Sequence, residues 1–188
     1  KSILNVLDRC GIKYLVSQDK NIIKKSSKLI LPGVSNFSFC MESLKINKLD
    51  ELIRDYTLVD KKPFLGICSG MQVLGSFSEE GNTMGLNIIP GKIKKMPINK
   101  AKIVPHVGWN KVNFKDSIIT KEIKNNSRFY FCHSYYYEPE DASHIIMKTF
   151  YGLEFASAIN FNNIYGIQFH PEKSLKEGMQ IIKNFSDY

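Results

Sequence analysis

The chain has 188 residues, of which 43% are hydrophobic and 23% charged, and its formal net charge is +8. Those proportions are ordinary for a globular protein and exclude a disordered tail, a collagen-like fibre and a charge-dominated coil. No run of 18 apolar residues occurs, so we expect neither a transmembrane helix nor a membrane partner. A chain of this length is expected to form one domain over residues 1–188.

The first third of the chain alternates helix-like and strand-like segments. In chain order, the apolar spacing predicts a helix over 2–10, strands over 14–16 and 29–31, helices over 37–44 and 49–56, and a strand over 63–67. This alternation is typical of an α/β fold with a mixed, mostly parallel sheet and helices on both faces. A parallel sheet ordinarily begins with a strand, so we expect a first strand to precede Lys1.

The second half of the chain is rich in strands. Strand-like runs occupy 88–93, 128–137, 144–150 and 155–169, and a closing helix is expected over 175–185. The spacing of Leu175, Met179 and Ile182 predicts that these three residues share the buried face of that helix.

The cysteines and the basic residues bound the kind of protein. Four scattered cysteines form no CxxC pair, which argues against a disulfide scaffold and a zinc ribbon. No secretory leader is visible, so we expect thiols in a reducing cytoplasm. The lysines are spread along the chain, which favours a solvated basic face over a nucleic-acid partner.

The segment Gly66-Ile67-Cys68-Ser69-Gly70 follows an apolar strand and precedes a helical stripe. This is the nucleophile-elbow pattern G-x-S-x-G with cysteine in place of serine, so Cys68 is predicted to be an exposed, strained nucleophile. The following helix would present N–H groups to the sulfur and favour the thiolate. The alternative is a core cysteine in a glycine-containing turn. We expect the remaining cysteines (Cys10, Cys40 and Cys132) to be core residues.

A thiolate nucleophile needs a base and a group that orients the base. His170 ends an apolar strand, and Glu172 lies two residues further on, where its carboxylate could hold the second ring nitrogen. His133 and His106 are alternative bases that lack a nearby carboxylate in sequence. A glycine at Gly33, after the strand over 29–31, would let the backbone aim amides at a developing oxyanion.

Five motifs together resemble one enzyme family. They are Leu31-Pro32-Gly33-Val34, the elbow Gly66 to Gln72, Pro105-His106-Val107-Gly108-Trp109-Asn110, Phe131-Cys132-His133-Ser134-Tyr135-Tyr136, and His170-Pro171-Glu172-Lys173-Ser174. In this order they resemble the class I (triad) glutamine amidotransferases, which have a flavodoxin-like fold. The third and fourth motifs resemble the HisH-type glutaminase subunits of imidazole glycerol phosphate synthase in particular.

The resemblance implies a role for each motif residue and needs no cofactor or metal. Cys68 would attack the carboxamide of L-glutamine, His170 would relay the proton and Glu172 would orient His170. The implied supporting residues are Gly33 and Val34 for the oxyanion, Met71, Gln72, Ser134 and Tyr135 for glutamine, and Trp109 and Lys173 for the interface or ammonia gate. Two residues depart from the family pattern: Ser35 stands where the family usually has glycine, and Ser69 stands where it usually has a bulky apolar residue.

The resemblance also implies a partner. Ammonia would pass to a (β/α)₈-barrel cyclase in a heterodimer that makes imidazole glycerol phosphate and AICAR in histidine biosynthesis. One alternative is a paralogue that supplies ammonia to a sugar-amidating enzyme system. A second is a stand-alone cysteine hydrolase, although such an enzyme has no use for a docking face. A non-enzymatic basic binding protein would leave the cysteine elbow unexplained.

Overall fold

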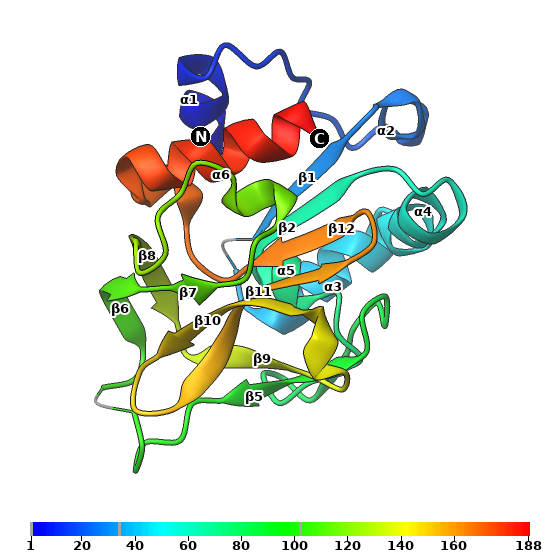
Figure 1. Ribbon diagram of the computed structural model, residues 1–188. Coiled ribbons are helices and arrows are strands. Elements are labelled where there is room, and N and C mark those ends of the chain that lie inside the picture. The colour runs from blue at the N-terminus through cyan, green and yellow to red at the C-terminus, as the bar shows by residue number, and fades with distance from the viewer. Residues whose placement is uncertain (1, 34, 102) are drawn as a thin grey trace.

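The computed structural model describes residues 2–33, 35–101 and 103–188 (Figure 1). Apart from short 3₁₀ turns and a π-helix over Asp55–Val59, its helices have the following bounds: α1 Ser2–Arg9, α2 Lys20–Lys25, α3 Phe37–Ile46, α4 Leu49–Arg54, α5 Ser69–Gln72 and α6 Leu175–Asp187. None of the helices in these ranges combines the length and the apolar character needed to span a bilayer.

A mixed sheet runs through the molecule in the order β1-β2-β12-β11-β9-β5-β3-β4. In addition, β10 pairs with β11, and β7 pairs with β10. Strands β1, β2 and β12 are parallel, as is the β3–β5 pair, and the other pairs are antiparallel. The bounds are β1 Leu29–Gly33, β2 Phe64–Cys68, β3 Phe77–Ser78, β4 Thr83–Met84, β5 Gly91–Lys95, β7 Asn113–Phe114, β9 Tyr135–Pro139, β10 Ile145–Phe150, β11 Glu154–Phe161 and β12 Ile164–Ile167. Two further strands, β6 His106–Lys111 and β8 Arg128–His133, form a separate antiparallel ribbon.

Helices cover both faces of the parallel strands, as the sequence predicts (Figure 1). Leu65 and Ile67 of β2 pack in one buried cluster with apolar residues of α1 and α6. Phe64, which points to the opposite face because side chains alternate along a strand, packs in a second cluster with α3 and α4. The two clusters hold the sheet between them, and the predicted α/β fold with a mixed sheet is confirmed.

The parallel register brings three strand ends to one edge of the sheet. Gly33, the last residue of β1, is directly opposite Cys68, the last residue of β2. On the other side of β2, Ile67 is paired with Ile167, the last residue of β12. Chain segments that leave the carboxyl ends of neighbouring parallel strands therefore meet here, which is where α/β proteins place their ligands.

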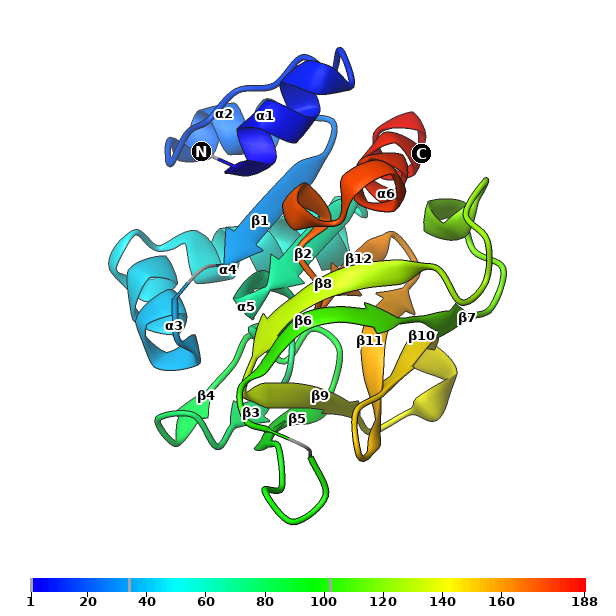
Figure 2. The same cartoon turned by 90° about the vertical axis from the view of Figure 1, so that its left-hand side faces the viewer.

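The β6–β8 ribbon lies over this edge and has two different faces (Figure 2). Cross-strand pairs Val107–Cys132 and Trp109–Tyr130 are exposed or half-buried, whereas the alternate pair His106–His133 is buried. The period of two along each strand produces this division. Cys132 is thus exposed, and its predicted place in the core is wrong. Cys10 and Cys40 are half-buried against the two apolar clusters.

Two local predictions differ from the structure. Residues 14–16 form no strand, and Leu15 and Val16 are 83% and 74% exposed. A strand needs a hydrogen-bonded neighbour, and β1, the strand at one edge of the sheet, pairs only with β2 among the described residues. Leu175 begins α6 at a positive φ and is 72% exposed, so it does not share the buried face with Ile182.

Candidate active site

The turn from β2 to α5 holds Cys68 in a strained conformation, as predicted, but Cys68 is buried, only 7% exposed, so its predicted exposure is wrong. Its φ is 55° and its ψ is −115°, a combination that costs a residue with a Cβ about 1–3 kcal/mol. Two glycines allow the turn, because a Cβ on Gly66 would collide with the backbone of Gly70, and a Cβ on Gly70 would collide with the carbonyl of Leu31. The G-x-C-x-G spacing thus lets α5 approach β1 and β2 closely directly after Cys68.

The loop after β12 is fastened to β8, and this fastening positions His170. The backbone N–H of His170 donates to the carbonyl of Tyr130 at 2.8 Å. The hydroxyl of Ser174 donates to the carbonyl of His170 and accepts the N–H of Tyr130. Hydrogen bonds therefore hold both the N–H and the carbonyl of His170, independently of its side-chain contacts.

His170 and Glu172 form a buried pair. The Nδ1 atom of His170 lies 2.9 Å from Oε1 of Glu172, and the two side chains are 8% and 6% exposed. Burial lowers the pKa of His170, but hydrogen bonding with Cys68 and Glu172 outweighs it and raises that pKa to about 10. Burial raises the pKa of Glu172, and the hydrogen bond with His170 reverses this, so its pKa is lowered. At neutral pH the pair is an imidazolium held by a carboxylate.

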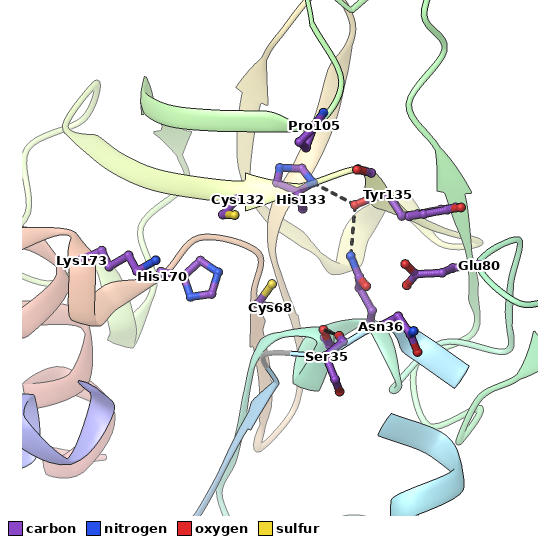
Figure 3. A pocket seen from close by; sticks show the side chains of 13 residues that line it. Ser35, Asn36, Cys68, Glu80, Pro105, Cys132, His133, Tyr135, His170 and Lys173 are labelled. Atoms are coloured by element: carbon purple, nitrogen blue, oxygen red, sulfur yellow. Dashed lines mark hydrogen bonds between the residues drawn. The ribbon is translucent and has the colours of Figure 1, made fainter. Parts of the chain in front are cut away.

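A cavity of about 380 Å³ opens above Cys68. Figure 3 shows His170 and Lys173 on one side of Cys68, and Asn36 and Glu80 on the other. The described lining residues are Ser35, Asn36, Cys68, Ser69, Gln72, Glu80, Pro105, Cys132, His133, Ser134, Tyr135, His170 and Lys173. A cavity of this size, with the carboxylate of Glu80 and the ammonium of Lys173 in its lining, suits a small zwitterion.

Most of the predicted site residues meet in this cavity. Gln72, Ser134 and Tyr135 line it together with Cys68 and His170. Four predicted residues that the structure describes do not line it: Gly33, Met71, Trp109 and Glu172, the last of which is paired with His170. Gly33 lies beside Cys68 in the sheet register. The side chain of Met71 is fully buried and packs against Gly166 of β12, so only the backbone of Met71 can serve the site. Val34 lies outside the described residues.

The two histidines considered as alternative bases are paired with each other. Nδ1 of His133 lies 2.8 Å from the carbonyl oxygen of Tyr135, and Nε2 of His133 lies 3.2 Å from Nδ1 of His106. Burial lowers the pKa of His133 to about 3 and that of His106 to about 4. Both nitrogens of His133 are already engaged and both rings are neutral at pH 7, so the geometry favours His170 as the base.

Ser69, one of the two departures from the family pattern, has a specific contact. Its hydroxyl donates to the carbonyl oxygen of Ser35, the other departure. The contact joins the residue after Cys68 to the segment that follows β1. Ser69 also lines the cavity, so its hydroxyl fastens the two segments to each other beside the site.

The predicted gate residues are linked through a tyrosine that the sequence analysis missed. Lys173 lines the cavity, and its Nζ lies 5.2 Å from the ring centroid of Tyr130. Trp109 does not line the cavity but packs edge-on against the same ring, at 6.0 Å between centroids. Tyr130 therefore connects the cavity to the outer face of the β6–β8 ribbon.

Two more lining residues were not anticipated. Glu80 reaches the cavity from the turn after β3, and its Oε2 accepts the backbone N–H of Phe37 at 2.8 Å. Asn36 caps α3 by accepting the N–H of Phe39. An Asn before an apolar helical stripe signals a cap, but no local pattern marks Glu80, because its position depends on contact with residues about 40 positions away.

A strained cysteine in one cavity with a buried histidine–carboxylate pair is the arrangement of a cysteine-dependent acyl-transfer enzyme, and sequence comparison gives the family. The family Glutamine amidotransferase class-I matches residues 1–187. The chain therefore belongs to the class I glutamine amidotransferases, an enzyme family.

Within that family its relatives are HisH subunits. A Methanococcus maripaludis protein named imidazole glycerol phosphate synthase subunit HisH 2 is 43% identical over 185 residues, which cover 98% of this chain and 92% of the relative. The Chlorobaculum tepidum imidazole glycerol phosphate synthase subunit HisH is 41% identical over 192 residues, which cover 100% and 94%. The predicted resemblance to HisH-type glutaminase subunits is confirmed at the level of homology.

Solved structures share the fold at low sequence identity. A crystal structure of a glutamine amidotransferase aligns with a TM-score of 0.76 at 14% identity, covering 99% of this chain and 91% of that chain. The glutaminase domain of Trypanosoma brucei CTPS with bound acivicin aligns with a TM-score of 0.67 at 16% identity, covering 99% and 87%.

Proposed function

We propose that this chain is the glutaminase subunit of an imidazole glycerol phosphate synthase, acts in histidine biosynthesis and hydrolyses L-glutamine to glutamate and ammonia. The observation that carries the proposal is Cys68, held at positive φ on the β2–α5 turn, in one cavity with the buried His170–Glu172 pair. Homology to HisH subunits over almost the whole chain supports the choice of pathway.

The triad accounts for both halves of the reaction. The thiolate of Cys68 attacks the carboxamide carbon of glutamine, and the resulting tetrahedral intermediate loses nitrogen as ammonia when the imidazolium of His170 donates its proton. The C–N bond breaks and a glutamyl thioester remains on Cys68. Neutral His170 then takes a proton from water, which attacks the thioester, releases glutamate and restores the thiolate–imidazolium pair. Glu172 holds His170 in one orientation throughout.

The charges around the cavity orient the substrate. Glu80 is the one carboxylate among the described lining residues, and it lies on the side of Cys68 away from His170 (Figure 3). We assign it to the α-ammonium group of glutamine, with Gln72 and the Ser134–Tyr135 backbone holding the rest of the molecule. The carboxamide then points toward Cys68, and ammonia is released on the side of His170 and Lys173.

The outer face of the β6–β8 ribbon is the proposed docking face for a (β/α)₈-barrel subunit. Val107 and Trp109 expose apolar surface there, and Cys132 on the neighbouring strand lines the cavity. An apolar surface that borders the point where ammonia is released suits a partner that receives ammonia before it escapes to solvent.

The function is tested by measuring glutamine turnover by the purified chain alone and with a barrel cyclase subunit carrying its substrate. We expect a low rate alone and a rise of about 10²–10³-fold with the partner, the size of effect that one oxyanion donor has when it is turned into place at Gly33 or Val34. Stimulation by another barrel subunit only would favour the sugar-amidating paralogue. Fast hydrolysis without any partner would favour the stand-alone hydrolase.

Removing the side chain of Trp109 or of Lys173, the two proposed gate residues, should uncouple glutamine hydrolysis from synthesis of the amidated product. In Trp109→Ala and Lys173→Ala we expect the partner-stimulated synthesis of amidated product to fall more than glutamine hydrolysis, because ammonia leaks when the contacts around Tyr130 are lost. The measurement is the ratio of product to glutamate. Val59→Ala, at a 71% exposed apolar residue outside the ribbon, is the matched control. Unchanged ratios in both variants would remove Trp109 and Lys173 from the interface.

A further inference from the structure

The triad leaves one buried polar side chain beside Cys68 without a role. Gln168 is the first residue after β12 and is fully buried, and its backbone N–H donates to the carbonyl of Ser157 at 2.9 Å. Its side-chain Nε2 lies 3.7 Å from the Sγ atom of Cys68, within hydrogen-bonding distance for a sulfur acceptor. An amide is not kept in an apolar interior unless its polar atoms are satisfied.

The orientation of the Gln168 amide follows from a single backbone carbonyl. The carbonyl oxygen of Tyr135 can only accept, so the Gln72 atom that lies 3.0 Å from it must be the donor Nε2. The same Nε2 lies 3.0 Å from Gln168, which must therefore present its acceptor Oε1. The remaining nitrogen of Gln168 then faces Cys68, and a flipped amide would bring two NH₂ groups together.

The Tyr135 carbonyl is itself held from the other side. His133 donates to it through Nδ1, and the Nε2 atom of His133 accepts from Nδ1 of the buried His106. The Nε2 atom of His106 faces the side-chain amide of Asn110, which also donates to the carbonyl of Phe150. The direction of every hydrogen bond from Asn110 to Tyr135 is consistent with neutral histidines, so the anchor for Gln72 and Gln168 does not rearrange near neutral pH.

We propose that Gln168 is a positioning residue for the nucleophile: its side-chain amide donates a hydrogen bond to the Cys68 sulfur, holds it toward the cavity and favours the thiolate over the thiol. The inference rests on the proposed role of Cys68. Helix α5 has only four residues, so its dipole contributes little at the sulfur. His170 can lose its proton during the reaction, whereas the amide of Gln168 remains a donor at every pH.

The pH dependence of alkylation tests the contact directly. In Gln168→Met, which keeps the length of the side chain and removes the donor, we expect the midpoint for alkylation of Cys68 by iodoacetamide to rise by about one pH unit. Peptide mass spectrometry separates Cys68 from Cys132, whose profile should not move. The other ionisable groups around the thiol, which are His170, His133, Lys173 and Glu80 at the cavity and Cys40 behind the elbow, are the same in both proteins.

Steady-state kinetics distinguish positioning from simple destabilisation. We expect Gln168→Met to lower kcat for glutamine about tenfold while KM changes little, because Gln72 keeps its contact with Tyr135. Asn184→Leu is the matched control: it removes another buried amide, which donates to the carbonyls of Ile119 and Lys121 away from the site. Asn184→Leu should destabilise the fold and leave the pH midpoint of Cys68 alkylation unchanged. An unchanged midpoint and kcat in a folded Gln168→Met protein would overturn the proposal.

The wild-type protein offers a test that needs no substitution at Gln168. The chain has four glutamines, at positions 18, 72, 168 and 180, so ¹⁵N-glutamine labelling gives a simple set of side-chain amide signals. The Gln168 signal should follow the pH profile of Cys68 alkylation. A Gln168 signal that ignores this profile would overturn the proposal. If the profile is followed but wild-type protein with its barrel partner hydrolyses no glutamine, the positioning role stands and the proposed function fails.

Discussion

Replacement of Cys68 by alanine or serine should abolish glutamine hydrolysis with or without a partner subunit. Alanine removes the nucleophile, and a serine hydroxyl is a far weaker nucleophile than a positioned thiolate at neutral pH. The measurement is glutamate release, with circular dichroism to verify folding. Because Cys68 has a φ of 55°, the free energy of unfolding of Cys68→Gly should exceed that of Cys68→Ala by about 1 kcal/mol. Cys68→Gly should therefore also unfold at the higher temperature. A Cys68→Ala protein that unfolds at a higher temperature than Cys68→Gly would contradict the strained backbone at Cys68.

Covalent labelling provides the complementary result for the same residue. An electrophilic glutamine analogue should modify Cys68 and spare Cys10, Cys40 and Cys132, because only Cys68 lies beside the His170–Glu172 pair at the end of the substrate cavity. Cys132 is the sharpest internal control, since it lines the same cavity and is more exposed. Loss of activity that accompanies labelling of Cys132 alone would remove Cys68 from its assigned role.

His170→Ala should reduce turnover by about 10²–10⁴-fold, the range for loss of a general acid and base. Glu172→Gln should reduce it less, because the imidazole remains and only its orientation and the stabilisation of its charge are lost. Partner-stimulated glutamate release measures both effects. Small and equal losses in the two variants would point to His133 as the base, in spite of the contacts that engage both of its nitrogens.

The same variants make a prediction about pH. The imidazolium of His170 must donate a proton to the leaving nitrogen, so kcat/KM should fall as the pH rises through the raised pKa of His170, about 10. In Glu172→Gln the carboxylate that helps to raise this pKa is gone, so the alkaline decline should begin at lower pH. If kcat/KM declined at the same alkaline pH in both proteins, Glu172 would have no part in setting the pKa of His170.

The geometry of the Cys68 turn and of the His170–Glu172 pair could be predicted from the sequence because the parts of each are local. Glycines two residues before and two after Cys68 describe a turn whose steric demands are met within five residues. The interval from His170 to Glu172 is likewise short, and Pro171 starts the 3₁₀ turn that brings the carboxylate back to the ring. Helices α1, α3 and α6 were predicted because apolar spacing of 3.6 residues is a property of each segment alone.

Predictions failed where the outcome depended on a distant partner. The apolar run at 14–16 has the composition of a strand, but among the described residues no neighbour pairs with it. The run 128–133 has aromatic residues on both faces, and its pairing with β6 decides that Phe131 is buried and Cys132 is exposed. A shift of one residue would exchange the two faces, and no feature of the run itself selects the register.

The sequence by itself determined the candidate chemical groups, a strained cysteine with a histidine and a carboxylate, because backbone strain and short-range spacing are encoded within a few residues. Only the tertiary structure decided which groups surround that nucleophile. The donor from Gln168 to Cys68 spans 100 positions, and Gln72 meets Tyr135 across 63. Such contacts arise from strand register and from the packing of two sheets, and hydrogen-bond direction is defined only once both partners are in place.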